Sequence, residues 1–421
     1  MQSLKRNMER MAEVVPGSDS QVLQNFLTHS SWDHRDVMNR VAKSADTWLG
    51  GDEGTGLYID ESCHAKKGKK SVGVARQWNG RLGKTDNCQV GVYGALGKGQ
   101  HVSLIDARLY LPKPWTDDPR RCAQAGVPAA DRVHKTKPQL ALEIVEQART
   151  NGVRFEWVGM DAAYGSSFEL LQALDNSGEL FVADIRKDRH IYLEDPAPYV
   201  PASHPGKGRP RRRYCSDQCP VKVGEWVSGQ PDSAWKEKTL RDGERGHLVV
   251  QLLHRRIWLW DKKSSTAVQW HLIVRREVGA PNTIKYSLSN ASDDMGSTRL
   301  GRMQANRYWI ERAFQDAKSH LGMSHYQARK WSSWHRHMAL VMMAHHFMVE
   351  VRINNAGAFP LLSCYDIQVL MAHTLPSAHL DRQAVLAFMK QRHRRRKAAM
   401  ESAERKQLAS ATDQTPIDLS D

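Results

Sequence analysis

The segment from residue 54 to residue 185 constrains the fold more than any other part of this chain. It opens with four short runs in which Val, Leu and Ile alternate with polar residues, as in β-strands. These runs are residues 54–61, 71–78, 88–96 and 101–111. Two helical patterns and two apolar runs then alternate along the chain. They are a helix over 138–151, a strand over 154–160, a helix over 166–176 and a strand over 180–185. Strands that first meander and then alternate with helices predict an α/β fold with a mixed sheet.

The flanking segments have different textures. Residues 1–50 show helical spacing, and the helical signal disappears between residue 186 and about residue 246. Strand patterns follow over 247–253, 256–260, 268–275 and 284–288, and helices are expected over 295–321 and 334–354. We therefore divide the chain into five parts. They are a helical N-terminal segment (1–50), the first part of an α/β core (51–185), a β-rich insertion (186–290), the C-terminal helices of the core (291–355) and a basic C-terminal segment with a disordered tail (356–421).

The charge of the chain points to a polyanionic partner. Lys and Arg number 61 against 46 Asp and Glu, which gives a net charge of +15. The excess gathers in three runs, at 64–70, 206–213 and 390–406, and separated basic runs suit a long anion such as DNA. Within the first two runs the candidate DNA-binding residues are Lys66, Lys67, Lys69, Lys70, Arg211, Arg212 and Arg213. Each run taken alone could equally be a solvated surface loop.

Other functional classes are excluded by composition. Hydrophobic residues make up 40% of the chain, which is enough for a sizeable core. No apolar stretch is long enough to span a membrane, so we expect no membrane partner. Six cysteines are too few for a disulfide scaffold, and a cytosolic chain with reduced thiols is expected.

Three acidic residues occupy informative positions. Asp60 lies near the end of the first expected strand, and Asp161 directly follows the strand over 154–160. Carboxylates at the carboxyl ends of strands lie where α/β folds bind their ligands. Glu311 lies within the expected helix, where Arg307, Glu311 and Lys318 form one polar line beside the apolar stripe. Alone, a strand-end Asp is usually a turn or cap residue, and such a line is usually a solvated ion-pair row. The combination favours a functional site.

The chain resembles the DDE transposases of bacterial insertion sequences, in the IS4-like group and nearest to the IS701 family. The resemblance rests on LYIDES around Asp60, WVGMDAAYG around Asp161 and RYWIERAFQDAK from residue 307 to residue 318. The group's signature is Tyr, two residues, Arg, three residues, Glu, six residues and Lys. Arg307, Glu311 and Lys318 match it, whereas Gln304 stands at the position of the Tyr.

The resemblance implies an RNase H-like core of mixed sheet and helices, interrupted by the β-rich insertion and flanked by helical termini. It implies that Asp60, Asp161 and Glu311 are catalytic and bind two Mg²⁺ ions, with Mn²⁺ as a substitute, while Arg307 and Lys318 contact DNA phosphates. The implied reaction is metal-dependent cleavage at insertion-sequence ends followed by strand transfer. The implied partners are double-stranded DNA with terminal inverted repeats, target DNA and a second copy of the chain, in the bacterial cytoplasm at the nucleoid. Family members often carry more helical sequence upstream, so the N-terminal segment could be a truncated DNA-binding region.

Two other functions stay open at this point. One is a metal-dependent nuclease with the same core and no strand transfer. The other is a truncated or domesticated protein that only binds DNA. The presence of Asp60, Asp161, Glu311 and Lys318 argues against a decayed site.

Overall fold

The structure is a computed structural model that describes residues 7–51, 53–80, 82–202, 211–243, 246–278, 280–376 and 381–412. The chain divides into two compact units. One is residues 27–368, and the other combines residues 1–26 with residues 369–421. All the described strands belong to the larger unit.

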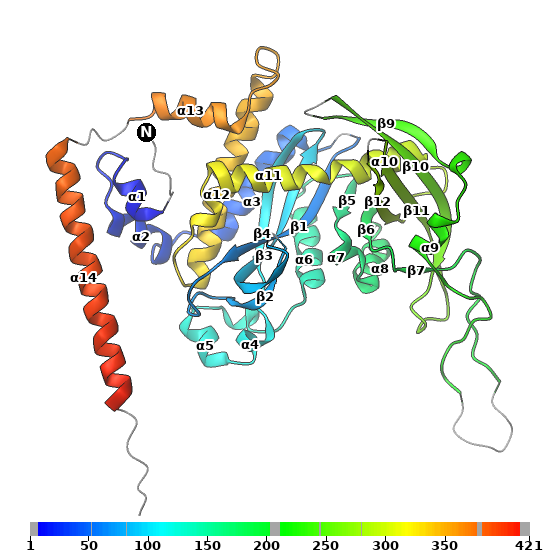
Figure 1. The fold of residues 1–421 in the computed structure, drawn as a ribbon, viewed down its shortest axis with the longest axis horizontal. Helices are drawn as coiled ribbons and strands as arrows, with labels where there is room; N and C mark the ends of the chain where they lie inside the picture. The colour runs from blue at the N-terminus through cyan, green and yellow to red at the C-terminus, as the bar shows by residue number, and fades with distance from the viewer. Residues whose placement is uncertain are drawn as a thin grey trace, which may run out of the picture. The chain divides into compact units, whose positions relative to one another are not determined.

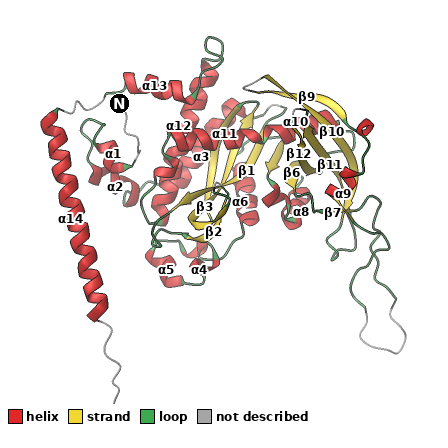
Figure 2. Ribbon diagram, in the orientation of Figure 1, coloured by secondary structure: helices red, strands yellow, loops and turns green. Residues whose placement is uncertain are grey.

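A mixed sheet forms the centre of the larger unit (Figures 1 and 2). Its first six strands are β1 (Gly56–Ala65), β2 (Ala75–Asn79), β3 (Lys84–Lys98), β4 (His101–Leu109), β5 (Trp157–Met160) and β6 (Phe181–Ile185). β3 pairs antiparallel with β1 along one edge and with β2 and β4 along the other. β1, β5 and β6 are parallel neighbours. The order β4–β3–β1–β5–β6 is that of an RNase H-like core, so the predicted fold class is confirmed.

Helices cover both faces of this sheet. One helix, α3 (His34–Leu49), precedes β1. The helices between β1 and the insertion are α4 (Lys113–Thr116), α5 (Pro119–Gln124), α6 (Lys137–Thr150), α7 (Ala162–Gly165) and α8 (Phe168–Asn176), with a 3₁₀ turn at Ala129–Asp131. The predicted helix over 138–151 is α6. It begins with a capping box in which Thr136 and Gln139 bond each other's backbone, and it ends before Gly152, whose φ is +76°.

The alternation of side chains along β1 assigns the two faces. Leu57 and Ile59 belong to a core shared with α6 and α8, whereas Tyr58 belongs to a core shared with α11 (Tyr308–His320) and α12 (Trp331–Asn354). Residues of β1 with even numbers therefore face α11, which crosses the strands in Figure 1. This face carries the site described below.

The insertion continues the same sheet. Its strands are β9 (Lys236–Gly243), β10 (Gly246–Leu259), β11 (Val268–Glu277) and β12 (Ala280–Ser289), an antiparallel meander that joins β6 through β12. A small pair, β7 (His190–Ile191) and β8 (Val221–Lys222), precedes α9 (Val223–Ser228) and a 3₁₀ turn at Asp232–Ala234. Strand is confirmed over most of the two runs predicted at 247–253 and 256–260, but the break between them is wrong, because β10 is continuous. His254 and Arg255 stay in register with Ile273 and Leu272, and the His254 ring bonds that of His271.

The helix predicted over 295–321 is also wrong, because it is two helices, α10 (Ser297–Asn306) and α11 (Tyr308–His320). Arg307 between them keeps helical dihedrals, with φ −54° and ψ −29°. The Ile310 N–H bonds the Arg307 carbonyl three residues back, which tightens one turn and interrupts the α-helical ladder. A 3₁₀ turn at Met323–His325 and α12 (Trp331–Asn354) follow.

The smaller unit is helical. It contains α1 (Met8–Ala12) and α14 (Arg382–Thr412), with most of α2 (Ser20–Thr28) and part of α13 (Cys364–Thr374). Within it, Arg392 of α14 forms an ion pair with Glu13, at 2.5 Å between Nη2 and Oε1. The tail predicted to be disordered lies, from residue 413 onward, outside the described residues. No described helix combines the length and apolarity that crossing a membrane requires.

We predict that Gly165→Ala destabilises the larger unit by about 1–3 kcal/mol. A Cβ at this position would lie far inside contact distance of the Asp184 backbone carbonyl, because α7 packs directly on β6. Gly357→Ala is the control, since this exposed residue lies outside the helices and a Cβ there meets no atom within 4 Å, so stability should change by less than about 0.5 kcal/mol. Urea unfolding of both variants measures the difference. Equal stabilities would contradict the close approach of α7 to β6.

Candidate active site

Three aspartates lie side by side where the parallel pairing of β1, β5 and β6 ends. The prediction that Asp60 lies near the end of its strand is wrong, because β1 continues to Ala65 through its pairing with β3. Ile59 of β1 pairs with Met160 of β5, which pairs with Ala183 of β6. The residue after each partner is an aspartate: Asp60, Asp161 and Asp184. Each stands two residues beyond a position on the α11 face, so all three side chains point to that face. The fold thus builds a row of three carboxylates, which we call the aspartate row.

Helix α11 adds a fourth carboxylate and a cation. The Arg307 guanidinium contacts Asp60 Oδ2 through Nη1 at 3.4 Å and Glu311 Oε1 through Nη2 at 3.0 Å. Its Nε lies 3.3 Å from Asp184 Oδ2. The Arg307 side chain is only 9% exposed, whereas that of Glu311 is 50% exposed. Arg307 therefore lies buried among the carboxylates, and Glu311 lies on their solvent side.

The structure brings together four of the five residues predicted as the central site. Asp60, Glu311 and Arg307 are in direct contact, and the charge of Asp161 acts on both Asp60 and Arg307. Asp161 is also the N-cap of α7, where its Oδ1 accepts from Ala163 N and Tyr164 N. Asp161 can therefore cap α7 and belong to the candidate site at once, because the cap uses only one of its two carboxylate oxygens.

Lys318 lies elsewhere on α11. Its Nζ is 5.4 Å from the centre of the Phe314 ring, and its charge contributes to lowering the pKa of His64 near the end of β1. The larger cause of that lowered pKa, to about 3, is the burial of His64. Lys318 therefore lies beside the distal part of β1.

Sequence reasoning missed Asp184. The run LFVADI was recognised as a buried strand, but its penultimate aspartate was not singled out. A signal was available, because Asp184 occupies on β6 the position that Asp60 occupies on β1. Asp184 Oδ1 accepts a hydrogen bond of 2.5 Å from Ser287 Oγ of β12, so the insertion contacts the aspartate row directly.

The electrostatics of the site favour an added cation. Burial is the main cause that raises the pKa of Asp60 to about 7, and the charge of Asp161 raises it further. For Arg307, burial opposes the charged form, but the carboxylates outweigh it, Asp184 first, and raise the pKa of Arg307 above its ordinary value. One guanidinium thus only partly neutralises the carboxylates.

The donor set fits a divalent cation chemically. Carboxylate oxygens are the ligands that Mg²⁺ and similar hard cations take. Among the described residues, however, no three His, Cys, Asp or Glu side chains converge closely enough to hold a metal ion. Arg307 occupies part of the space between Asp60 and Glu311, so a bound cation requires these side chains to adjust.

The predicted basic residues differ in exposure. Lys66 is partly buried, since its Nζ donates to the Tyr326 carbonyl at 2.6 Å and lies over the Tyr326 ring, and burial lowers its pKa to about 8. Lys67, Lys69 and Lys70 are exposed, as are Arg211, Arg212 and Arg213. Residues 206–210 of the second basic run lie outside the described part of the chain.

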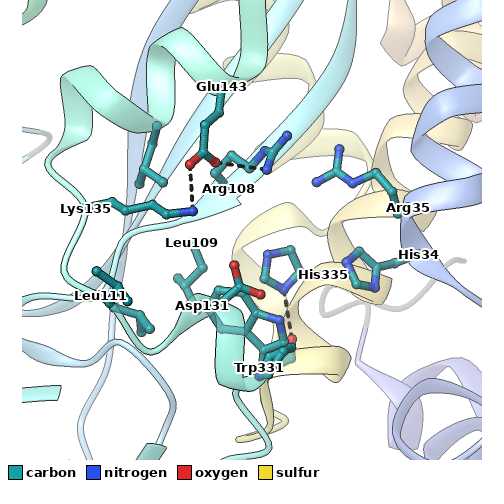
Figure 3. Close-up of a pocket in the computed structure, with 13 residues that line it drawn as sticks. His34, Arg35, Arg108, Leu109, Leu111, Asp131, Lys135, Glu143, Trp331 and His335 are labelled. Atoms are coloured by element: carbon teal, nitrogen blue, oxygen red, sulfur yellow. Dashed lines mark hydrogen bonds and ion pairs between the residues drawn. The ribbon is translucent and has the colours of Figure 1, made fainter. Parts of the chain in front are cut away.

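A separate cavity of about 180 Å³ lies between α3, β4, α6 and the start of α12 (Figure 3). Three of its charged side chains are paired with one another, and Arg35 pairs with Asp106. Arg108 and Lys135 both bond Glu143, and the His335 ring bonds the Trp331 carbonyl. None of the aspartate row lines this cavity.

Comparisons with known proteins agree with this geometry. The profile of a family described as DDE superfamily endonuclease matches residues 1–247, a stretch that contains Asp60 and Asp161. The chain belongs to the DDE endonuclease superfamily.

Two individual proteins give more detail. A probable transposase for insertion sequence element IS701 from Microchaete diplosiphon is 25% identical over 332 residues, which cover 77% of this chain and 72% of that protein. The predicted resemblance is thereby confirmed. Among solved structures, the NurA nuclease from Sulfolobus solfataricus aligns over 77% of this chain and 91% of its own, at 10% identity. Its TM-score of 0.23 is too low to define a shared fold.

We predict that Asp60→Asn stabilises the protein at alkaline pH when divalent cations are chelated. The pKa of Asp60 is about 7 in the fold against an ordinary 3.8, so the folded protein holds the proton more tightly. The resulting stabilisation is complete below pH ~4 and is lost as the pH rises through 7. At pH 8 the free energy of unfolding of the variant should exceed that of wild type by more than ~1 kcal/mol, and at pH 4 the two free energies should be equal.

Urea unfolding in EDTA at both pH values makes this measurement. Asp188→Asn, which changes an exposed carboxylate beyond β6, is the control and should show no such pH dependence. Equal stabilities of wild type and Asp60→Asn at pH 8 would contradict the electrostatic strain at Asp60.

Proposed function

We propose that this protein is a transposase, which cleaves DNA at the ends of an insertion sequence and joins the released 3′ ends to target DNA. The observation that supports the proposal best is that Arg307 contacts both Asp60 of β1 and Glu311 of α11, while the charge of Asp161 acts on the same guanidinium. The chain's membership in the DDE endonuclease superfamily supports the cleavage step. The name of the IS701 relative favours strand transfer in addition to cleavage.

In this proposal Asp60, Asp161 and Glu311 hold the divalent cations, two Mg²⁺ ions for which Mn²⁺ can substitute. When bound, the ions would activate the attacking oxygen and stabilise the leaving oxygen of an in-line phosphoryl displacement. The fold prepares the aspartates for this task by fixing one oxygen of each. Asp60 Oδ1 accepts from Glu61 N and Asp161 Oδ1 from two N–H groups of α7, which directs the second oxygens to the site.

Arg307 contacts the DNA in this proposal. A guanidinium presents parallel N–H donors that match two phosphate oxygens, and its charge persists at any working pH. Nη1 and Nη2 of Arg307, now on Asp60 and Glu311, are the donors that a phosphate near the cut would take. Lys318, farther along α11, would contact a phosphate beyond the scissile one.

The remaining basic residues would bind the DNA flanking the cut. The exposed residues Lys67, Lys69 and Lys70 follow β1, which carries Asp60, so DNA held in the active site would run past them. Arg211, Arg212 and Arg213 extend from the insertion. Two transposon ends must be brought together for strand transfer, so we propose that two copies of the chain act as a pair on bacterial DNA.

We predict that Asp161→Asn and Glu311→Gln abolish cleavage, with a loss of at least about 10³-fold, and leave DNA binding intact. The assay uses a supercoiled plasmid that carries the inverted repeats flanking the gene, with Mg²⁺ or Mn²⁺. Asp175→Asn is the control, because Asp175 lies on α8 and bonds Trp270 and Asn290 outside the site. Excision with insertion supports a transposase, cleavage alone a nuclease, and a gel shift without cleavage a DNA-binding protein. Full activity of Asp161→Asn would refute the assignment.

We predict that replacing Lys67, Lys69 and Lys70 together by Gln weakens DNA binding and reduces its salt dependence. Each lost phosphate contact should lower the slope of log K against log salt by about 0.9, so the triple variant should lose up to about 2.7. Lys43→Gln, an exposed lysine of α3, is the control. Fluorescence anisotropy with a labelled duplex at several salt concentrations measures the slopes. An unchanged slope in the triple variant would place the DNA elsewhere.

A further inference from the structure

A chain of buried polar contacts leads from the insertion to Arg307. Gln304 Nε2 lies 2.7 Å from Ser287 Oγ, and Ser287 Oγ lies 2.5 Å from Asp184 Oδ1. Asp184 Oδ2 then faces Arg307 Nε at 3.3 Å. Gln304 is 3% exposed, Ser287 0% and Arg307 7%. We call these four residues the buried relay.

The chemistry of the groups fixes the direction of the relay. The ionised Asp184 can only accept, so the Ser287 hydroxyl must donate to it. That hydroxyl then has only its lone pairs to offer Gln304, so the Gln304 amide nitrogen donates to it. Gln304 therefore donates to Ser287, and Ser287 donates to Oδ1 of Asp184. The other oxygen of Asp184, Oδ2, faces Nε of Arg307. Gln304 Oε1 is buried with no hydrogen-bond partner among the described residues, which is destabilising.

The relay controls the orientation of the guanidinium. The guanidinium of Arg307 is rigid and planar, and Nε, Nη1 and Nη2 donate in different directions within that plane. Because Asp184 binds Nε, the plane cannot rotate about its long axis, and Nη1 and Nη2 are directed at Asp60 and Glu311. Arg307 also lies at the junction of α10 and α11, where its backbone ladder is interrupted, so side-chain contacts are needed to fix it.

We propose that Asp184 is a positioning residue, which acts with Ser287 and Gln304 to hold the Arg307 guanidinium in the orientation that binds the DNA phosphate. This inference rests on the proposed function. It also assigns a role to Gln304, the residue that departs from the signature of the resembling group. A Tyr has no amide nitrogen to donate to Ser287, so the relay in this form belongs to chains with Gln at this position.

The relay also connects two parts of the chain. Ser287 belongs to β12, the last strand of the insertion, and Gln304 belongs to α10, which leads into α11. A shift of β12 relative to β6 would change the Ser287–Asp184 contact first and Arg307 next.

A double-mutant cycle tests the proposal. Arg307→Gln, Asp184→Asn, Ser287→Ala and the two double variants with Arg307→Gln are compared for single-turnover plasmid cleavage and for binding of a labelled duplex in EDTA. Asp184→Asn and Ser287→Ala should each slow cleavage by about 10–100-fold, as expected when a supporting contact is lost. In EDTA each should weaken binding and reduce the salt slope by up to about 0.9. Neither should weaken cleavage or binding further in the Arg307→Gln background.

Asp175→Asn is the matched control, since it removes the charge of another part-buried carboxylate that bonds the insertion sheet at Trp270. It should lower thermal stability comparably and leave the salt slope unchanged. Ser287→Ala is the smaller change and keeps the proposal testable should Asp184→Asn fail to fold. Effects of Ser287→Ala that add fully to those of Arg307→Gln would overturn the proposal.

The two levels of inference fail differently. Wild-type cleavage and binding by Arg307→Gln would refute the proposed phosphate contact of Arg307 and the relay with it. Suppose instead that Arg307→Gln impairs cleavage and binding, whereas Asp184→Asn and Ser287→Ala behave like the control Asp175→Asn. That result would refute the relay and leave the phosphate contact of Arg307 standing.

Discussion

The contact between one guanidinium and the carboxylates around it determines how this active site is built. Asp60, Asp184 and Glu311 come from β1, β6 and α11, and each contacts a different nitrogen of Arg307. Without that cation, partly buried carboxylates would repel one another and disfavour the packing of α11 on the sheet. The pKa of Asp60 nevertheless stays raised, first because the carboxyl is buried and second because of the charge of Asp161. Arg307 thus holds together carboxylates from three separate elements.

Much of this arrangement could be predicted from the sequence, because it depends on short-range periodicity. The strand patterns placed Asp161 directly after β5 and Asp60 within β1, and the period of 3.6 placed Arg307 and Glu311 on one flank of a helix. The order of elements was sufficient to predict an α/β fold with a mixed sheet, and the RNase H-like core was predicted from the resemblance. The resemblance then related three distant segments that no local pattern could connect.

What the sequence did not reveal depends on long-range pairing. The break at Arg307 leaves the residue in helical dihedrals, so neither a Gly nor a Pro marks it. His254 and Arg255 suggested a gap because these polar residues interrupt the apolar runs, whereas in the fold their pairing with β11 keeps the strand continuous. Asp184 was visible as a strand-end aspartate, but its importance comes from Ser287, more than 100 residues away. Such contacts depend on which strands become neighbours.

The pairing of β12 with β6 makes the insertion an architectural part of the catalytic sheet. Tyr286 to Ser289 form a ladder with Ile185 to Val182, so β6 has a neighbour on both sides. A version of this chain without the insertion would expose β6 as an edge, with unpaired N–H and C=O groups that invite aggregation. Exchange of the insertion between related chains would therefore have to preserve the β6 register and a hydroxyl at position 287. The insertion is consequently constrained to evolve together with the core rather than as an interchangeable module.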